Sequence, residues 1–223
     1  MSNLLVVLLG PPGSGKGTQG ALLAERTWMK HVSTGDLLRA NIATGSELGK
    51  KAAELQKVGA YVDDATMTAM ISEVVSGQEP IILDGFPRTW PQAVALEGLI
   101  VEKKMQLLPI LLEIDVDVLK RRIAGRLTHP GSGRVYNVET NPPAQPMKDD
   151  LTGEPLVRRP DDIVELFDLR FHTYRTGIEP VVEYYEKRGL VRLDADRTPE
   201  EVLGSLEEVM EKSMTPTTPA IDF

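Results

Sequence analysis

A glycine-rich loop near the N-terminus has the residue types and spacing of a phosphate-binding site. The apolar run Leu4–Leu9 predicts a buried strand, and the segment GPPGSGKGT, residues 10–18, follows it directly. The pattern G-x-x-x-x-G-K is met by Gly10, Gly15 and Lys16. Glycines let backbone N–H groups turn toward phosphate oxygens, and a helix beginning near Lys16 would direct its positive dipole end at them. The loop predicts a nucleoside triphosphate site in which Lys16 faces the terminal phosphates.

A second segment, PIILDGFPRT at residues 80–89, places an acidic and a basic residue after another expected strand. Asp84 ends that strand, where P-loop proteins hold an acidic residue beside Mg²⁺. Gly85 permits the close approach of a ligand, and Pro87 stiffens the turn that presents Arg88. The segment predicts a partner for the phosphate loop.

Arginines recur where a closing phosphate site needs them, since guanidinium groups suit phosphate oxygens. They are Arg39, Arg88, Arg122, Arg126, Arg134, Arg159 and Arg170. Arg122 and Arg126 are four residues apart in an expected helix and should share one face. In a chain of net charge −8, converging arginines indicate a local anionic ligand. The sequence shows no plausible general base, and a phosphate acceptor, already ionised near pH 7, needs none.

Apolar runs alternate with helical patterns, which predicts an α/β fold with a mostly parallel sheet covered by helices on both faces. The expected strands are Leu4–Leu9, Pro80–Leu83, Leu107–Ile114 and Leu190–Leu193, with a short one at His31–Val32. The expected helices are Gly17–Thr27, Gly35–Ala43, Glu47–Val58, Asp63–Ser76, Trp90–Val101, Val116–Arg126, Asp161–Lys187 and Pro199–Lys212. The irregular segment 128–160, rich in Gly and Pro, predicts a hairpin-bearing subdomain or lid. The tail 215–223 is expected to be disordered.

Composition narrows the class of protein. A net charge of −8 argues against general nucleic-acid binding, and the absence of Cys excludes disulfides and thiolate metal sites. The first strand begins almost at residue 1, which leaves no room for a signal peptide, and no apolar run reaches the roughly 20 residues that span a bilayer. We expect a soluble cytoplasmic protein, with the mitochondrial matrix left open, that binds neither nucleic acid nor membrane.

The motifs in combination closely resemble the long-lid adenylate kinase family. They are GPPGSGKGTQ, VSTGDLLRANI, GSELGKKA, ILDGFPRTWPQA, RIAGR, HPGSGRVYN, NPP and DDLTGEPLVRRPDD. The resemblance implies a P-loop CORE domain (1–32, 63–124 and 163–223), an AMP-binding domain (33–62) and a LID domain (125–162). It also implies a monomeric enzyme that reversibly converts Mg·ATP and AMP into two ADP.

The resemblance also implies site residues, position by position. Those matching the family's ATP site are Gly13, Ser14, Gly15, Lys16, Gly17, Thr18, Arg122, Arg126, Val135, Tyr136 and Arg197. Those matching its AMP site are Thr34, Arg39, Ala60, Tyr61, Val62, Gly85, Phe86, Pro87, Arg88, Gln92, Arg159 and Arg170, with Gln92 on the adenine edge. Lys16, Arg88, Arg126, Arg159 and Arg170 would act on the transferred phosphate, and Thr18 and Asp84 would hold Mg²⁺ partly through water.

LIDs of this family carry either four zinc-binding cysteines or a hydrogen-bonded polar tetrad. This chain has no Cys and places a possible tetrad at the matching positions: His129, Ser132, Asp149 and Thr152. The resemblance therefore implies a LID without zinc.

The identity of the phosphate donor stays open at this point. Asn137 stands where ATP-preferring bacterial members commonly have His, and the sequence around it is similar to that of the GTP:AMP phosphotransferase branch. An amide can meet guanine O6 or adenine N6, so Asn137 is a candidate reader of the donor base. The rivals are that phosphotransferase, a UMP or CMP kinase (disfavoured by the long lid and Gln92), and a non-catalytic nucleotide-binding protein on the same fold.

Overall fold

A five-stranded parallel sheet forms the centre of the computed structural model, which describes residues 3–75, 77–159, 162 and 164–214. The strand order is β2 (Lys30–Ser33), β3 (Ile81–Asp84), β1 (Leu4–Leu9), β4 (Gln106–Glu113) and β7 (Val191–Asp194). All four neighbouring pairs are parallel. The expected α/β class is confirmed, and each expected strand lies within two residues of its predicted bounds.

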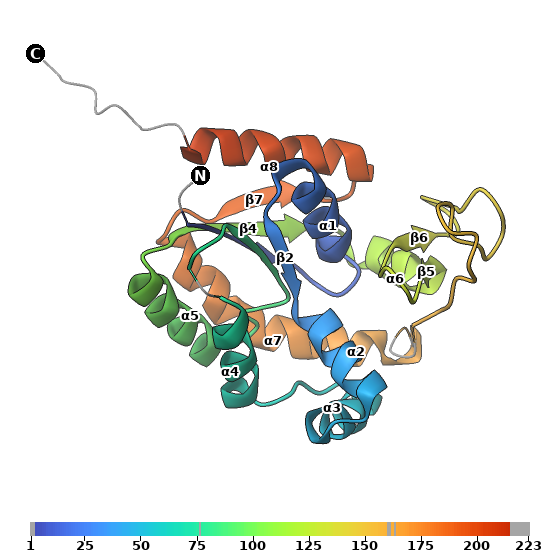
Figure 1. The fold of residues 1–223 in the computed structure, drawn as a ribbon, viewed down its shortest axis with the longest axis horizontal. Coiled ribbons are helices and arrows are strands. Elements are labelled where there is room, and N and C mark those ends of the chain that lie inside the picture. The colour runs from blue at the N-terminus through green and yellow to red at the C-terminus, as the bar shows by residue number, and fades with distance from the viewer. Residues whose placement is uncertain (1–2, 76, 160–161, 163, 215–223) are drawn as a thin grey trace, which may run out of the picture.

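The central strand β1 is buried on both faces because its side chains alternate between two cores. Leu5 and Val7 belong to one core with residues of α4, α5 and α7. Val6 and Leu8 belong to the other with residues of α1 and α8. Figure 1 shows α1 and α8 on one side of the sheet and α4, α5 and α7 on the other. This double coverage explains why the strand is apolar throughout.

The helices begin and end close to the expected positions. They are α1 (Lys16–Thr27), α2 (Thr34–Thr44), α3 (Glu47–Lys57), α4 (Asp64–Val74), α5 (Trp90–Lys103), α6 (Val116–Gly125), α7 (Phe167–Glu186) and α8 (Pro199–Met214), with a 3₁₀ turn η1 (Val164–Leu166) before α7. The expected start of the α7 helix at 161, and the tail 215–223, fall outside the described residues. Among the helices that the structure describes, none is long and apolar enough to cross a membrane.

The irregular segment does carry the expected hairpin. Strand β5 (Arg126–Thr128) pairs antiparallel with β6 (Val135–Asn137). Helix α6 ends at Gly125, and Arg126 is extended with φ −70° and ψ 133°. The prediction that Arg122 and Arg126 share a helix face is therefore wrong, because the chain turns from helix into strand between them.

The carboxyl ends of β1 and β3 meet at one edge of the sheet, where parallel strands of open α/β folds position ligands. The loop after β1 leads into α1, and the turn after β3 leads into α5. In Figure 1 the α2–α3 pair projects at the bottom and the β5–β6 hairpin at the right, so both protrude from the sheet.

Candidate active site

The loop between β1 and α1 curls around the Lys16 side chain. The Lys16 ammonium donates to the carbonyl oxygens of Gly10 at 2.8 Å and Pro11 at 2.9 Å. Gly15 caps α1 with φ 94°, a left-handed conformation that disfavours any residue with a Cβ. The cradle is thus a turn whose backbone leads directly into a helix N-terminus, an arrangement suited to anions.

The Lys16 ammonium is buried among other cations. Burial lowers the pKa of Lys16 to about 8; Asp84 opposes this shift, and Arg88, Arg126 and Arg170 add to it. Asp84 raises this pKa whereas three guanidinium groups lower it, so the immediate surroundings of the ammonium are cationic. The electrostatics therefore favour a ligand that carries several negative charges.

A larger cavity adjoins this cradle, and a smaller one adjoins the larger. The larger, of about 420 Å³, is lined by all the residues assigned to the ATP site and by Asp84. The smaller, of about 100 Å³, lies under α2 and α3. The AMP-site residues that line it are Thr34, Arg39, Ala60, Tyr61, Val62, Gly85, Arg88, Gln92 and Arg170. Arg39, Tyr61, Gly85, Arg88 and Arg170 line both cavities, which places them between the two.

The turn after β3 presents Arg88 to both cavities. The Arg88 Nε donates to the Gly85 carbonyl at 2.7 Å, and its guanidinium lies 5.0 Å from the centre of the Tyr61 ring. A Cβ on Gly85 would come within 2.5 Å of the Thr34 hydroxyl, so only glycine fits. The Tyr61 ring thus packs against the Arg88 guanidinium.

The remaining arginines reach the larger cavity from different elements. Arg126 pairs with Asp162 through Nε at 2.7 Å and through a second contact, and Arg159 Nε donates to the Thr128 hydroxyl at 3.0 Å. Burial and the nearby charges of Arg126 and Arg39 lower the pKa of Arg159 to about 10. These arginines therefore line one cavity, in agreement with the hypothesis that they converge on an anionic ligand.

Two residues do not lie where the sequence suggested. Phe86 lines neither cavity, because its side chain is fully buried in the core that also contains Leu5 and Leu83. Arg134 faces away from the phosphate site: its Nε and Nη2 bind the two carboxylate oxygens of Asp149 at 2.8 and 2.6 Å. Arg134 is therefore a structural residue of the hairpin region.

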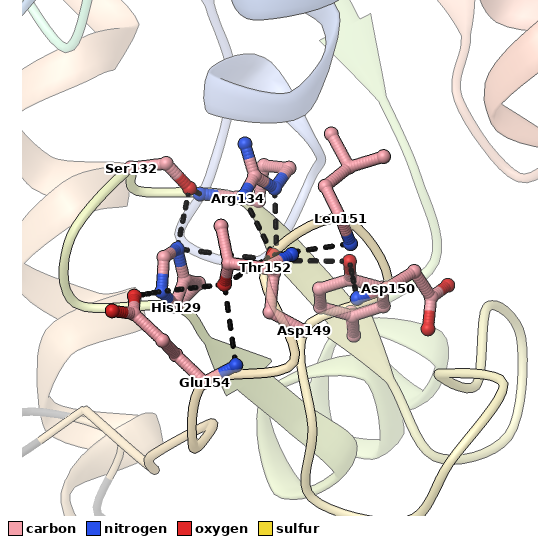
Figure 2. A network of polar contacts seen from close by, with 9 residues as sticks. His129, Ser132, Arg134, Asp149, Asp150, Leu151, Thr152 and Glu154 are labelled. Carbon is pink, nitrogen blue, oxygen red and sulfur yellow. Dashed lines mark hydrogen bonds and ion pairs between the residues drawn. The ribbon is translucent and has the colours of Figure 1, made fainter.

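A polar network joins the predicted tetrad (Figure 2). His129 Nδ1 lies 2.8 Å from the Ser132 hydroxyl, and the Thr152 hydroxyl donates to Asp149 at 3.0 Å and lies 3.5 Å from His129 Nε2. The four residues do meet. Glu154, which the sequence analysis missed, binds His129 Nε2 at 2.6 Å. Tyr136 OH also donates to Asp149, at 3.0 Å.

The amide of Asn137 is committed to the backbone. Its Nδ2 donates to the Arg122 carbonyl at 2.9 Å, and its Oδ1 accepts from the N–H groups of Glu139 and Thr140 at 2.9 and 3.2 Å. These contacts join the end of α6 to the turn after β6. Asn137 also lines the larger cavity, and its second Nδ2 N–H is left for a ligand.

The sequence did not predict the acidic residues that bind Arg126 and Gln92. Asp162 lies 36 positions from Arg126, and Asp64 lies 28 from Gln92, to which it is bonded. The pair Asp63-Asp64 predicted only a helix start. Asp63 does cap α4, whereas Asp64 reaches across to α5.

The chain offers oxygen ligands of the kind Mg²⁺ prefers. Asp84 is 7% exposed at the end of β3, and its Oδ2 would lie 3.4 Å from a Cβ on Gly17 in α1. The Thr18 hydroxyl is two residues from Lys16 on the same cavity wall. A carboxylate and a hydroxyl beside a phosphate cradle fit a cation carried in with the nucleotide. Among the residues that the structure describes, no group of three or more His, Asp or Glu side chains is placed to hold a metal by itself.

The sheet order, the glycine-rich loop and the cationic cradle define a P-loop nucleotide-binding enzyme of the nucleoside monophosphate kinase class. A family model described as adenylate kinase matches residues 8–190. The chain is 44% identical over 212 residues to an adenylate kinase of Malassezia globosa, covering 92% of this chain and 83% of the relative. It is 44% identical over 217 residues to one of Aspergillus oryzae (95% and 84%) and 42% identical over 217 residues to one of Vanderwaltozyma polyspora (95% and 97%). The chain belongs to the adenylate kinase family.

Proposed function

We propose that this protein reversibly transfers the terminal phosphate of ATP to AMP, giving two ADP. The observation that carries the proposal is the shared wall of the two cavities, where Arg88 and Arg170 face both. A donor phosphate in the cradle and an acceptor phosphate at Arg88 would meet across this wall. The relatives named above are all adenylate kinases, which supports the same pair of substrates.

Some of these residues would position the phosphates, and others would neutralise their charge during transfer. Lys16 would hold the phosphates of the donor, and Arg88 the phosphate of the acceptor. Arg126, Arg159 and Arg170 would neutralise the negative charge on the transferred group. Because the attacking group is an ionised phosphate oxygen, alignment and preorganised charge supply the catalysis without a general base.

Mg²⁺ would enter with the donor nucleotide. When bound, it neutralises phosphate charge and aligns the phosphates for in-line transfer. Thr18 and Asp84 would hold it, partly through water. Their carboxylate and hydroxyl oxygens are the chain's contribution to that site.

The two protruding segments would enclose the substrates. We take residues 33–62, which contain α2 and α3, as the AMP-binding domain and residues 125–162, which contain the hairpin, as the LID domain. The remainder, 1–32, 63–124 and 163–223, would form the CORE. Closure of both segments would exclude water and protect the donor from hydrolysis. We also propose a monomer located in the cytoplasm.

We propose ATP as the preferred donor. Arg122 lines the donor cavity and its Nη2 donates to the Arg197 carbonyl at 3.3 Å, so a base could stack on a guanidinium held in place by the backbone. The Arg197 guanidinium turns instead to the Asp194 carbonyl and the Ser205 hydroxyl. The GTP:AMP alternative rests on Asn137, which lines the same cavity and keeps one N–H that could meet guanine O6, and the donor comparison below decides between the two nucleotides.

A coupled assay of ADP formation tests the proposal. Each of ATP, GTP, CTP and UTP is offered as donor with AMP, and then AMP, CMP, UMP and GMP are each offered as acceptor with ATP. We expect AMP to be the best acceptor and ATP the best donor. Turnover with GTP but not ATP would assign the protein to the GTP:AMP branch, and failure of AMP as acceptor would overturn the proposal.

A further inference from the structure

Gln92 is held by two partners from different parts of the chain. It lies in the first turn of α5 and is 2% exposed on the wall of the smaller cavity. Its Oε1 accepts from the backbone N–H of Arg88 at 2.8 Å, and its Nε2 donates to Asp64 Oδ1 at 2.8 Å. The same Asp64 oxygen accepts from the Thr89 hydroxyl at 2.9 Å. Asp64 therefore ties the start of α4 to the turn that presents Arg88.

The chemistry of these partners permits only one orientation of the Gln92 amide. A backbone N–H can only donate, and a carboxylate can only accept. Rotating the amide by 180° would set its NH₂ against the Arg88 N–H and its carbonyl against the Asp64 carboxylate. Both pairs would then be unsatisfied, which is costly because the Gln92 side chain is itself buried. Asp64 is the partner that a side-chain substitution can change.

An amide locked in this way leaves one donor and one acceptor for a ligand. Nε2 keeps one N–H, and Oε1 keeps one lone pair. The edge of a 6-aminopurine offers a donor at N6 beside an acceptor at N1. A 6-oxopurine offers an acceptor at O6 beside a donor at N1, which is the reverse order. A fixed amide therefore complements one type of purine and opposes the other in the same pose.

We propose that Asp64 is a specificity-determining positioning residue. By holding the Gln92 amide in one orientation, it makes the acceptor site take a 6-aminopurine nucleotide and reject a 6-oxopurine nucleotide. This inference rests on the proposed function, with AMP as the acceptor. Asp64 acts through Gln92 and need not touch the substrate.

The test compares AMP with IMP, whose base has O6 and N1–H where adenine has N6 and N1. In Asp64→Asn the new amide can turn either its oxygen or its NH₂ toward Gln92, so at nearly constant volume the orientation depends on the Arg88 N–H alone. We expect the ratio of kcat/KM for AMP over IMP to fall at least about tenfold, with kcat/KM for IMP itself rising. A merely structural loss would lower both acceptors and leave this ratio unchanged.

The matched control is Asp63→Asn at the neighbouring position. Asp63 accepts from the Thr66 N–H as the cap of α4, and its other oxygen pairs with Lys51. We expect this variant to lose stability while keeping the ratio of AMP to IMP. A ratio that falls equally in both variants would show that the start of α4 matters only as a support, which overturns the inference.

The remaining outcomes separate the inference from the proposed function. An unchanged ratio in folded Asp64→Asn, or equal use of AMP and IMP by the wild type, overturns the inference alone. Should Asp64→Asn fail to fold, Asp64→Ser carries the same expectation, because a hydroxyl also donates or accepts, and an unchanged ratio there is equally decisive. A wild-type protein that phosphorylates neither AMP nor IMP overturns the proposed function itself.

Discussion

Lys16 and the arginines around it form a cationic cluster that a bound anion would stabilise further. Burial and the nearby cations lower the pKa of Lys16 to about 8, with Asp84 as the opposing carboxylate. Arg88 is further fixed by the Gly85 carbonyl and the Tyr61 ring. At the scale of single residues the site is thus preorganised for phosphate, and the loss of one guanidinium should lower kcat.

Replacement of Arg88 tests this preorganisation. We expect Arg88→Ala to lower kcat by about 10²–10³, which corresponds to roughly 3–4 kcal/mol of transition-state stabilisation, while the melting temperature changes little. The measurement is steady-state ADP formation at saturating AMP and ATP. Arg175→Ala is the control, since Arg175 is exposed on α7 and should leave kcat unchanged. A kcat of Arg88→Ala within about threefold of wild type would contradict the assignment.

Asn137 allows a test of donor choice. Because its amide already serves the Arg122 carbonyl and the N–H groups of Glu139 and Thr140, we expect Asn137→His to slow ATP and GTP turnover together. The ATP-to-GTP ratio of kcat/KM should stay within about threefold of the wild-type ratio. A ratio that rises tenfold or more would show that residue 137 reads the donor base after all.

At the scale of elements, the β5–β6 hairpin is a small unit with its own polar network. It has only a three-residue apolar cluster, Leu127, Tyr136 and Leu156. Hydrogen bonds around Asp149 and His129 supplement this cluster (Figure 2). Short strands with so little apolar burial need such additional links.

The pH dependence of stability should report on Asp149. The hydrogen bonds from Arg134, followed by those from Thr152 and Tyr136, hold the pKa of Asp149 well below its ordinary value of 3.8. A depressed carboxyl pKa contributes stability that is fully present above 3.8 and is lost as the pH falls below it. We therefore expect Asp149→Asn to be less stable than wild type at pH 5, with the gap narrowing toward pH 3.

Urea unfolding at a series of pH values measures this gap. Asp150→Asn is the matched control, because Asp150 accepts from the Ala144 N–H rather than from Arg134. Its stability difference from wild type should vary far less with pH. A gap for Asp149→Asn that stays constant from pH 5 to pH 3 would show that the carboxylate contributes no linked stability.

The same network predicts that the segment proposed as the LID needs no zinc. The chain has no Cys, and His129 already has Ser132 and Glu154 as partners. We expect metal analysis of the untagged protein to find no stoichiometric zinc, and a chelator to move the melting temperature by no more than about 1 °C. Stoichiometric zinc, or a large fall in melting temperature after chelation, would refute this.

At the scale of the whole molecule, much of the architecture could be predicted because its signals are local. The apolar run of β1 and the loop through Lys16 lie within 15 consecutive positions, Leu4 to Thr18. The partners of Arg126 and Gln92 could not be predicted, since Asp162 and Asp64 approach them only through the tertiary fold. Arg126 itself was misplaced because helical spacing continues across Gly125, whereas the chain leaves the helix there.

The most direct test of the account follows the labelled γ-phosphate of ATP. In the presence of AMP and Mg²⁺, the account predicts that the label appears in the β-phosphate of newly formed ADP, with two ADP produced for each ATP consumed. No label should appear as inorganic phosphate, because closure over both nucleotides excludes water. Release of labelled inorganic phosphate at the same rate with or without AMP would contradict the central claim, since the protein would then be an ATP hydrolase rather than a kinase acting on AMP.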